Sequence, residues 1–155
     1  MATATWIRED LERSGVAYEE LHHQDAYTAQ QVAQREHISG RQVAKVVGVM
    51  VDDRPVEVVL PASRRVNLDR VKEVLGAQHA RLASETELEQ FFTDCEVGAI
   101  PALRHWRGVD VVMDAYLGGR DVFILGGTHR DVLRVRFDDW FKMVNPRVEW
   151  LSDPA

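Results

Sequence analysis

The chain has 155 residues, of which 45% are hydrophobic and 28% charged, and its formal net charge is −6. A chain of this length fits one domain, which we expect to span residues 1–155. The acidic balance argues against a duplex-DNA binder, whose surface would be basic. Cys95 is the single cysteine, so an intramolecular disulfide is excluded. The N-terminus has no apolar signal core and no run reaches transmembrane length, so we expect a cytoplasmic protein without a membrane partner.

The first part of the chain predicts two helices separated by a short strand. The apolar spacing over residues 5–15, which ends in a glycine, is typical of a short amphipathic helix. Residues 18–22 alternate enough to form a strand. A second helix is expected over residues 26–33, where Thr28 with Gln31 has the spacing of a capping box.

The stretch from residue 43 to residue 51 is a nearly unbroken apolar run that follows a helical turn expected at residues 40–44. It predicts a buried strand, and a turn signal at residues 52–55 followed by a second apolar run at 56–60 predicts a hairpin. Lys45 is the one charged residue of the first run. A surface lysine at a strand edge is the common case. Because burying an ammonium costs several kcal/mol unless it is paired or reaches a cleft, we expect Lys45 to face a ligand pocket.

The second half of the chain mixes helices with hairpins instead of alternating strand and helix. Asn67 and Ser84 are expected to cap two helices. The expected elements are a helix over 68–75, an extended piece over 80–83, a helix over 84–92, strands over 109–114, 122–125 and 132–136, a helix over 138–143 and a tail over 145–155 that is loose at its end. We therefore expect an α+β fold built on a mixed, partly barrel-like sheet with flanking helices.

Two loops contain glycines beside residues that could bind a ligand. The first is Gly98-Ala99-Ile100-Pro101, which is either a plain turn or a loop whose bare N–H groups bind a carbonyl oxygen or an oxyanion. The second is Gly126-Gly127-Thr128-His129, which suits a hairpin turn and also brings a hydroxyl and an imidazole to a strand end.

Other kinds of site find little support in the sequence. The six histidines show no metal-ligand spacing with a carboxylate, so no metal is expected. Neither a nucleophile elbow nor a phosphate-binding loop is present. A basic cluster near the start of the third helix is either a solvated face or a place where phosphates pass. Its members are Arg64, Arg65, Arg70 and Lys72.

Taken in order, these features resemble the YbaK/ProX family of aminoacyl-tRNA deacylases, which is related to the editing domain of bacterial prolyl-tRNA synthetases. The resemblance rests on His23 followed by Tyr27-Thr28-Ala29, on Val43-Ala44-Lys45, and on the run from Val59 to Leu68. The two glycine loops fall where that family has its Gly-x-x-Pro loop and its Gly-Ser/Thr turn. The resemblance covers the chain from about residue 5 to residue 143.

The resemblance implies hydrolysis of the ester that joins a wrong amino acid to the 3′ end of a tRNA, with no cofactor. Lys45 would be the catalytic residue and would contact the substrate near the ester and the terminal phosphate. The implied substrate-binding residues are His23, Tyr27, Thr28, Gly98, Ala99, Ile100, Pro101, Gly126, Gly127, Thr128 and His129. The implied partners are the acceptor end of an aminoacyl-tRNA, touched by the basic cluster, and an aminoacyl-tRNA synthetase.

One residue departs from the family pattern. Many members have Asn or Thr after the lysine, whereas this chain has Val46, which cannot donate a hydrogen bond. Strand alternation would point Val46 away from the face of Lys45. The amino-acid specificity of members with a polar residue there is therefore not carried over. Two other functions stay open, a non-catalytic protein that binds tRNA ends and a regulatory protein that binds a small metabolite.

Overall fold

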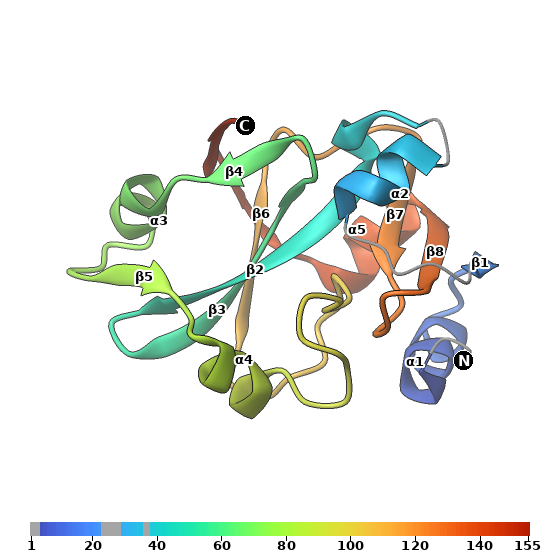
Figure 1. Ribbon diagram of the computed structural model, residues 1–155, viewed down its shortest axis with the longest axis horizontal. Coiled ribbons are helices and arrows are strands. Elements are labelled where there is room, and N and C mark those ends of the chain that lie inside the picture. Colours follow the sequence, from blue (N-terminus) through green and yellow to red (C-terminus); the bar gives the residue numbers. More distant parts are fainter. Residues whose placement is uncertain (1–3, 23–28, 36–37) are drawn as a thin grey trace.

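The computed structural model in Figure 1 describes residues 4–22, 29–35 and 38–155. The helices are α1 (Thr5–Arg13), α2 (Ala29–Arg35), the 3₁₀ turn η1 (Gly40–Gln42), α3 (Leu68–Val74), α4 (Glu85–Phe91) and α5 (Phe137–Val144). The strands are β1 (Tyr18–His22), β2 (Val43–Val51), β3 (Arg54–Pro61), β4 (Arg64–Val66), β5 (Ala80–Leu82), β6 (Asp110–Asp114), β7 (Asp121–Leu125), β8 (Asp131–Arg136), β9 (Arg147–Glu149) and β10 (Ser152–Pro154).

The main sheet has eight strands and is mixed. Seven of them follow the order β1-β8-β7-β2-β3-β6-β9, and β5 pairs with β2 off this path. β2 and β3 are antiparallel neighbours, whereas β2 runs parallel to β7 and β3 runs parallel to β6. β4 and β10 form a separate two-stranded ribbon. This arrangement confirms the expected α+β fold with a mixed sheet.

The central hairpin and two predicted caps are confirmed. Asp52 and Asp53 have φ values of 47° and 64°, the left-handed conformation that a two-residue hairpin turn requires and that aspartate tolerates. The Asn67 side chain accepts a hydrogen bond from the backbone N–H of Arg70 at the start of α3. Ser84 forms the predicted capping box of α4. These local contacts fix the ends of the elements that surround β2.

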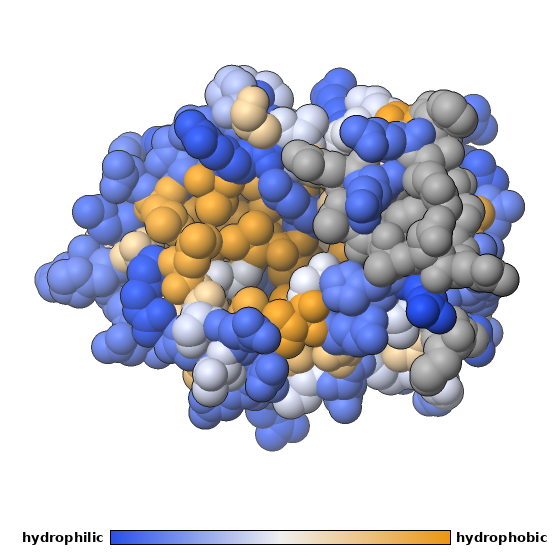
Figure 2. All heavy atoms as spheres, in the orientation of Figure 1, coloured by the Kyte–Doolittle hydropathy of each residue, from blue (hydrophilic) through white to orange (hydrophobic). Residues whose placement is uncertain are grey.

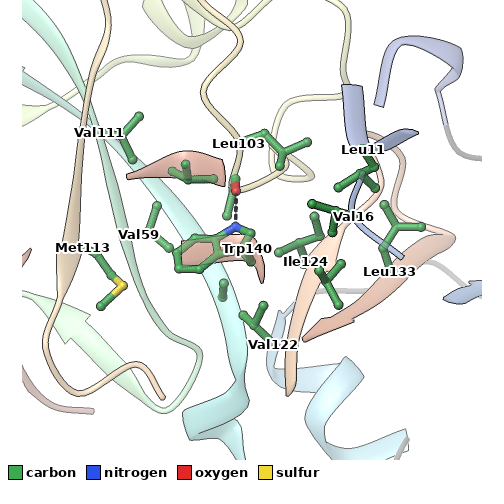
Figure 3. Packing of buried hydrophobic residues seen from close by; sticks show 14 of the residues in the cluster. Leu11, Val16, Val59, Leu103, Val111, Met113, Val122, Ile124, Leu133 and Trp140 are labelled. Atoms are coloured by element: carbon green, nitrogen blue, oxygen red, sulfur yellow. Dashed lines mark hydrogen bonds between the residues drawn. The ribbon is translucent and has the colours of Figure 1, made fainter. Parts of the chain in front are cut away.

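A buried tryptophan of α5 anchors the segment that follows the first glycine loop. The side chain of Trp140 is fully buried, and its indole N–H donates to the carbonyl oxygen of Ala102 over 2.7 Å. Figure 3 shows this bond at the centre of a cluster to which Val59 of β3 and Ile124 of β7 contribute. Because a buried hydrogen bond is costly to break, Ala102 has a fixed position one residue beyond the loop.

The C-terminal tail forms two strands, so the expectation that its end is loose was wrong. β9 pairs with β6, and β10 pairs with β4. Leu151, between the two strands, is fully buried, and its N–H donates to the Asp114 carboxylate over 2.9 Å. This contact joins residues that are 37 positions apart, which is why the local sequence pattern did not reveal it.

The second helix is confirmed as α2, whereas its predicted beginning at residues 26–28 lies outside the described residues. Within the described part of the chain, every helix is too short to cross a membrane.

Candidate functional site

Lys45 lies near the start of β2, opposite Leu60 of β3, and its side chain is half-buried. Burial lowers the pKa of its ammonium group from the ordinary value for lysine. Among the residues that the structure describes, its amine has neither an ion-pair partner nor a hydrogen-bond partner. A partly desolvated and unpaired cation of this kind is available to a ligand with negative charge or a polarised carbonyl group.

The faces of β2 separate Lys45 from the residue that follows it. Side chains alternate along a strand, so Val43 and Val47 share the face of Lys45. Val46 lies on the other face, where it packs near Phe92 and Trp106. The predicted orientation of Val46 is confirmed, and any influence of Val46 on a ligand at Lys45 is therefore indirect.

The face of β2 that carries Val47 opens into an apolar depression. Figure 2 shows hydrophobic residues gathered over β2 and toward α3, with a hollow in the middle of this surface. Several apolar side chains on this side remain only partly buried. They are Val47, Val66, Leu68, Val74, Leu75, Ala77 and Ala80. An apolar depression beside a lysine can exclude water from a small ligand while the lysine contacts its polar end.

The two glycine loops predicted from the sequence are in contact. Figure 1 shows the yellow segment between α4 and β6 beside the orange turn between β7 and β8. The backbone N–H of Glu96 donates to the carbonyl oxygen of Gly127 over 2.7 Å. The N–H of His129 donates to the Glu96 carboxylate over 2.8 Å, and the ring Nε2 of His129 donates to the carbonyl oxygen of Val97 over 3.1 Å. These three bonds make the two loops a single structural unit.

The first loop leaves backbone donors unused. Gly98 has a φ of +90°, and a Cβ atom there would lie 3.1 Å from Cε1 of His129, so glycine suits both the conformation and the contact. The N–H groups of Gly98 and Ile100 donate to no other described residue. Ala99 is buried in a cluster with Val43 of β2, which shares the face of Lys45. Ala99 therefore packs in the cluster of Val43, whereas Ile100 belongs to the cluster that Val46 packs against on the other face of β2.

A network of polar residues supports the second loop. The buried carboxylate of Asp131 accepts hydrogen bonds from the Thr128 hydroxyl and from Nδ1 of His22, the latter over 2.5 Å. His22 also contacts Glu20, which pairs with Arg8. The Asp131 hydrogen bond, followed by the contact with Glu20, raises the pKa of the His22 imidazole above its ordinary value.

Sequence reasoning missed the supporting residues Glu96, His22 and Asp131. Each acts on a residue far away in the chain; His22 and Asp131, for example, are 109 positions apart. The only signal in the sequence was that Glu96 and Asp131 stand next to the two glycine loops. Thr128 and His129, predicted to bind a ligand, make contacts that hold these loops, and their role toward a ligand stays a prediction.

Cys95 lies beside the first loop and is not an activated nucleophile. Burial, with smaller contributions from nearby carboxylates, raises the pKa of its thiol to about 12. At neutral pH the thiol is therefore protonated and a poor nucleophile. Over the described ranges, no three His, Cys, Asp or Glu residues gather in a way that could hold a metal ion.

The basic cluster is only partly available to a ligand. Arg64 donates to Ser152 through Nε and Nη2, over 2.6 and 3.0 Å. Arg70 donates to the carbonyl oxygen of Trp150 and pairs with Glu73. The side chains of Arg65 and Lys72 have no polar partner in the part of the chain described here. The predicted site residues His23, Tyr27 and Thr28 lie outside the described residues.

The geometry thus defines an α+β domain with a half-buried lysine on a central strand and two glycine loops that contact each other. The chain belongs to the family of aminoacyl-tRNA editing domains, whose match spans residues 23–143. The match includes Lys45 and both loops, and it confirms the family resemblance predicted from the sequence. The chain matches no curated protein.

Solved structures share the fold over nearly the whole chain. A hypothetical protein, APE2540, is 23% identical with a TM-score of 0.85, over 95% of this chain and 99% of its own. A structure described as a candidate trans-editing enzyme for prolyl tRNA synthetase is 21% identical with a TM-score of 0.81, over 95% and 94% of the two chains. A scaffold used for computational epitope grafting is 20% identical with a TM-score of 0.83, over 97% of each chain. At these identities the likeness concerns the fold.

Proposed function

We propose that the protein is an aminoacyl-tRNA deacylase that acts in trans and hydrolyses the ester bond of a mischarged tRNA. One observation carries the proposal. Among the described residues the half-buried amine of Lys45 has no polar partner, and Val43 on the same strand face shares a buried cluster with Ala99, whose neighbours Gly98 and Ile100 donate their N–H groups to no described residue. The membership of the chain in the family of aminoacyl-tRNA editing domains supports the same substrate class.

In the proposed reaction a water molecule attacks the carbonyl carbon of the aminoacyl ester. The carbonyl oxygen gains negative charge in the tetrahedral intermediate, and the N–H groups of Gly98 and Ile100 are the proposed donors to it. Fixed backbone donors stabilise such an oxyanion without reorganising during the reaction. Collapse of the intermediate breaks the bond to the ribose oxygen, which takes up a proton, so the products are the free amino acid and an uncharged tRNA.

Lys45 is the proposed catalytic residue. Its ammonium group would lie near the ester and the terminal phosphate, where a positive charge stabilises both the bound substrate and the developing oxyanion. The remaining predicted substrate contacts come from the two loops, and His23, Tyr27 and Thr28 stay proposals from the family resemblance. The reaction needs no protein nucleophile, which is consistent with the protonated thiol of Cys95.

Such a reaction is useful because a synthetase cannot exclude every wrong amino acid by binding alone. A synthetase pocket rejects a smaller amino acid only weakly, so a second site that hydrolyses what fits it improves accuracy. We propose the acceptor end of the tRNA as the partner, and the synthetase that makes the error as the protein whose product is corrected. Contact with the free tRNA end is compatible with a net charge of −6, because only a few phosphates need to be bound.

The test is deacylation across a panel of mischarged tRNAs by the purified protein and by Lys45→Ala. We expect release of the amino acid from at least one tRNA and loss of this release in Lys45→Ala. Lys142→Ala is the matched control, because Lys142 is an exposed lysine on α5. Release that is unchanged in Lys45→Ala would remove Lys45 from the mechanism. An absence of release from every tRNA, with tRNA binding retained, would favour a non-catalytic binding protein instead.

A further inference from the structure

Two aromatic side chains are exposed beside the C-terminal strands. Tyr116 follows β6 and is 41% exposed, and Trp150 lies between β9 and β10 and is 55% exposed. Their rings meet edge to face, with 4.8 Å between the ring centroids. Large aromatic residues are usually more buried than this in a soluble protein. Exposed aromatic pairs of this kind need a reason, and the proposed chemistry of the Lys45 site does not use them.

Three arginines surround this aromatic pair. The guanidinium carbon of Arg64 lies 3.6 Å from the ring centroid of Tyr116. Nε of Arg41 donates to the carbonyl oxygen of Tyr116 over 3.0 Å, and Nε of Arg70 donates to that of Trp150 over 3.1 Å. We call these five residues the aromatic–arginine surface. Their contacts hold the guanidinium groups in place, so a ligand would not have to order three long side chains on binding.

Four carboxylates lie near this surface, and one of them, Asp114, accepts from the Leu151 N–H and the Ser152 hydroxyl. Glu73 pairs with Arg70 over 3.0 Å. Asp153 accepts from the side-chain amide of Asn67, and Glu149 pairs with Arg147. Arg41 and Arg64 make no ion pair with any described carboxylate. These two guanidinium groups are therefore available to pair with the phosphates of an anionic ligand.

The aromatic–arginine surface lies at the same end of the central hairpin as Lys45. Arg41 belongs to η1, immediately before β2, and stands four residues before Lys45. The N–H of Ala62, at the end of β3, donates to the carbonyl oxygens of Gly40 and Val43 over 3.1 and 2.9 Å. Four residues of extended chain span at most about 13 Å. This distance corresponds to only a few nucleotide steps of about 3.4 Å along a stacked strand.

A second copy of the chain is the less suitable occupant. In a two-fold interface the same surface patch meets itself, so Arg41 and Arg64 would face the same arginines of the other copy. Like charges across an interface are costly. Duplex RNA also fits less well, because its base faces are stacked and closed to an aromatic side chain, whereas unpaired bases are open to stacking.

We infer that the aromatic–arginine surface binds the unpaired nucleotides of an RNA 3′ end next to the ester-bearing residue. A base stacks on Trp150, and the adjoining phosphates contact Arg41 and Arg64. This inference rests on the proposed function and extends it from the reacting ester to the nucleotides that precede it. The surface would hold the RNA end while the ester lies beside Lys45.

The test measures RNA binding without any reaction. The probes are a fluorescent RNA hairpin with four unpaired 3′ nucleotides and the same hairpin with a blunt end, both uncharged. Binding to each is followed by fluorescence anisotropy for the unchanged protein, Trp150→Ala, Trp150→Phe and Leu82→Ala. Leu82 is 54% exposed on β5 and serves as the control for loss of an exposed apolar side chain. Thermal unfolding verifies that each variant is folded.

We expect Trp150→Ala to bind the tailed hairpin about fivefold to a hundredfold more weakly, the range for loss of one base stack. Trp150→Phe, which keeps a ring, should lose less than Trp150→Ala, and Leu82→Ala should bind as the unchanged protein does. Binding to the blunt hairpin should not respond to Trp150→Ala. Arg41→Gln should weaken binding and lower the salt dependence by about one counterion.

Equal binding of the tailed hairpin by Trp150→Ala and by the unchanged protein would overturn the inference. So would sedimentation showing a dimer that Trp150→Ala dissociates, because the surface would then be covered by a second copy. The inference and the proposed function fail separately. If Trp150→Ala hydrolyses a mischarged tRNA at the unchanged rate and binds the tailed hairpin as the unchanged protein does, only the inference about the aromatic–arginine surface is contradicted. If Trp150→Ala loses binding of the tailed hairpin and the unchanged protein hydrolyses no mischarged tRNA, only the proposed deacylase function is contradicted.

Discussion

Lys45 and Glu57 are two isolated ionisable side chains on the same hairpin, and they differ in their access to solvent. Lys45 of β2 is half-buried and shares a strand face with Val47, one of the partly buried apolar residues of the surface toward α3. Glu57 of β3 lies opposite Gly48 and is fully buried. Neither oxygen of its carboxyl group has a hydrogen-bond partner in the described part of the protein.

Burial acts on both groups by the same mechanism but with different consequences. It lowers the pKa of the Lys45 ammonium and raises that of the Glu57 carboxyl well above its ordinary value, although Arg104 opposes the second shift. In each case the neutral form is favoured, because the charged form loses its hydration. Lys45 can still be reached by a ligand, whereas Glu57 cannot. We therefore expect Lys45 to matter for activity and Glu57 for stability.

The largest expected effect is the loss of activity in Lys45→Ala. Removing a fixed electrostatic contact to a developing oxyanion costs about a hundredfold to a thousandfold in rate. Initial rates of deacylation with a sensitive tRNA measure this effect, and Lys142→Ala should keep the full rate. A rate for Lys45→Ala within twofold of that of the unchanged protein would contradict the expectation that Lys45 matters for activity.

Glu57→Met should increase the free energy of unfolding by about 1–3 kcal/mol, the cost of burying a polar group without a hydrogen bond. Methionine fills a similar space with an apolar side chain, so little cavity or crowding should arise. Urea denaturation monitored by circular dichroism provides the measurement. Deacylation should stay unchanged, since Glu57 projects from the face of the sheet opposite to Lys45. A decrease in stability would mean that the carboxyl group has a favourable role in the fold.

The pH dependence of the free energy of unfolding should reveal the raised pKa of the Glu57 carboxyl group. Its pKa is raised in the folded protein, so its contribution to stability is fully present below the unfolded pKa, near 4.5, and is lost as the pH rises toward the folded pKa. Glu57→Gln cannot ionise and should flatten this part of the profile. Free energies of unfolding measured from pH 4 upward would test this. Parallel profiles for the two proteins would show that another group controls the slope.

The pH dependence of the rate separates two roles of Lys45. As a cationic anchor, Lys45 should support activity that falls as the pH rises through its lowered pKa. We expect this falling limb, because the proposed role is contact with an oxyanion and a phosphate. A rate that instead rises through the same pKa would identify the neutral amine as a base. Profiles of deacylation rate, corrected for spontaneous ester hydrolysis, distinguish the two.

The smallest expected effect is that of Lys45 on stability. Lys45→Met removes a partly desolvated charge that has no partner among the described residues, and the side chain keeps access to solvent. The free energy of unfolding should change by less than about 1 kcal/mol, in the stabilising direction. The same denaturation experiment applies. A destabilisation of several kcal/mol would show that Lys45 contributes to the stability of the fold. Its lack of a partner among the described residues would then be no argument for a role in activity.

Local sequence patterns were sufficient to predict the features that depend on neighbouring residues. The apolar run around Lys45, the aspartate turn and the second run predicted the hairpin, and Asn67 and Ser84 predicted the starts of α3 and α4. In each case the deciding residues lie within a few positions of one another. Repeated apolar positions and side-chain caps act over one turn of helix or one strand, so a local reading is sufficient.

Contacts between residues far apart in the chain became known only from the folded structure. His129 reaches Val97 across 32 positions and joins the two glycine loops, and Leu151 reaches Asp114 and orders the tail. Trp150 and Tyr116 form an exposed pair, and Glu57 loses every polar partner among the described residues. No local pattern encodes these outcomes, because burial and pairing depend on how the strands are ordered in the sheet. That order is set by the summed packing of the whole core.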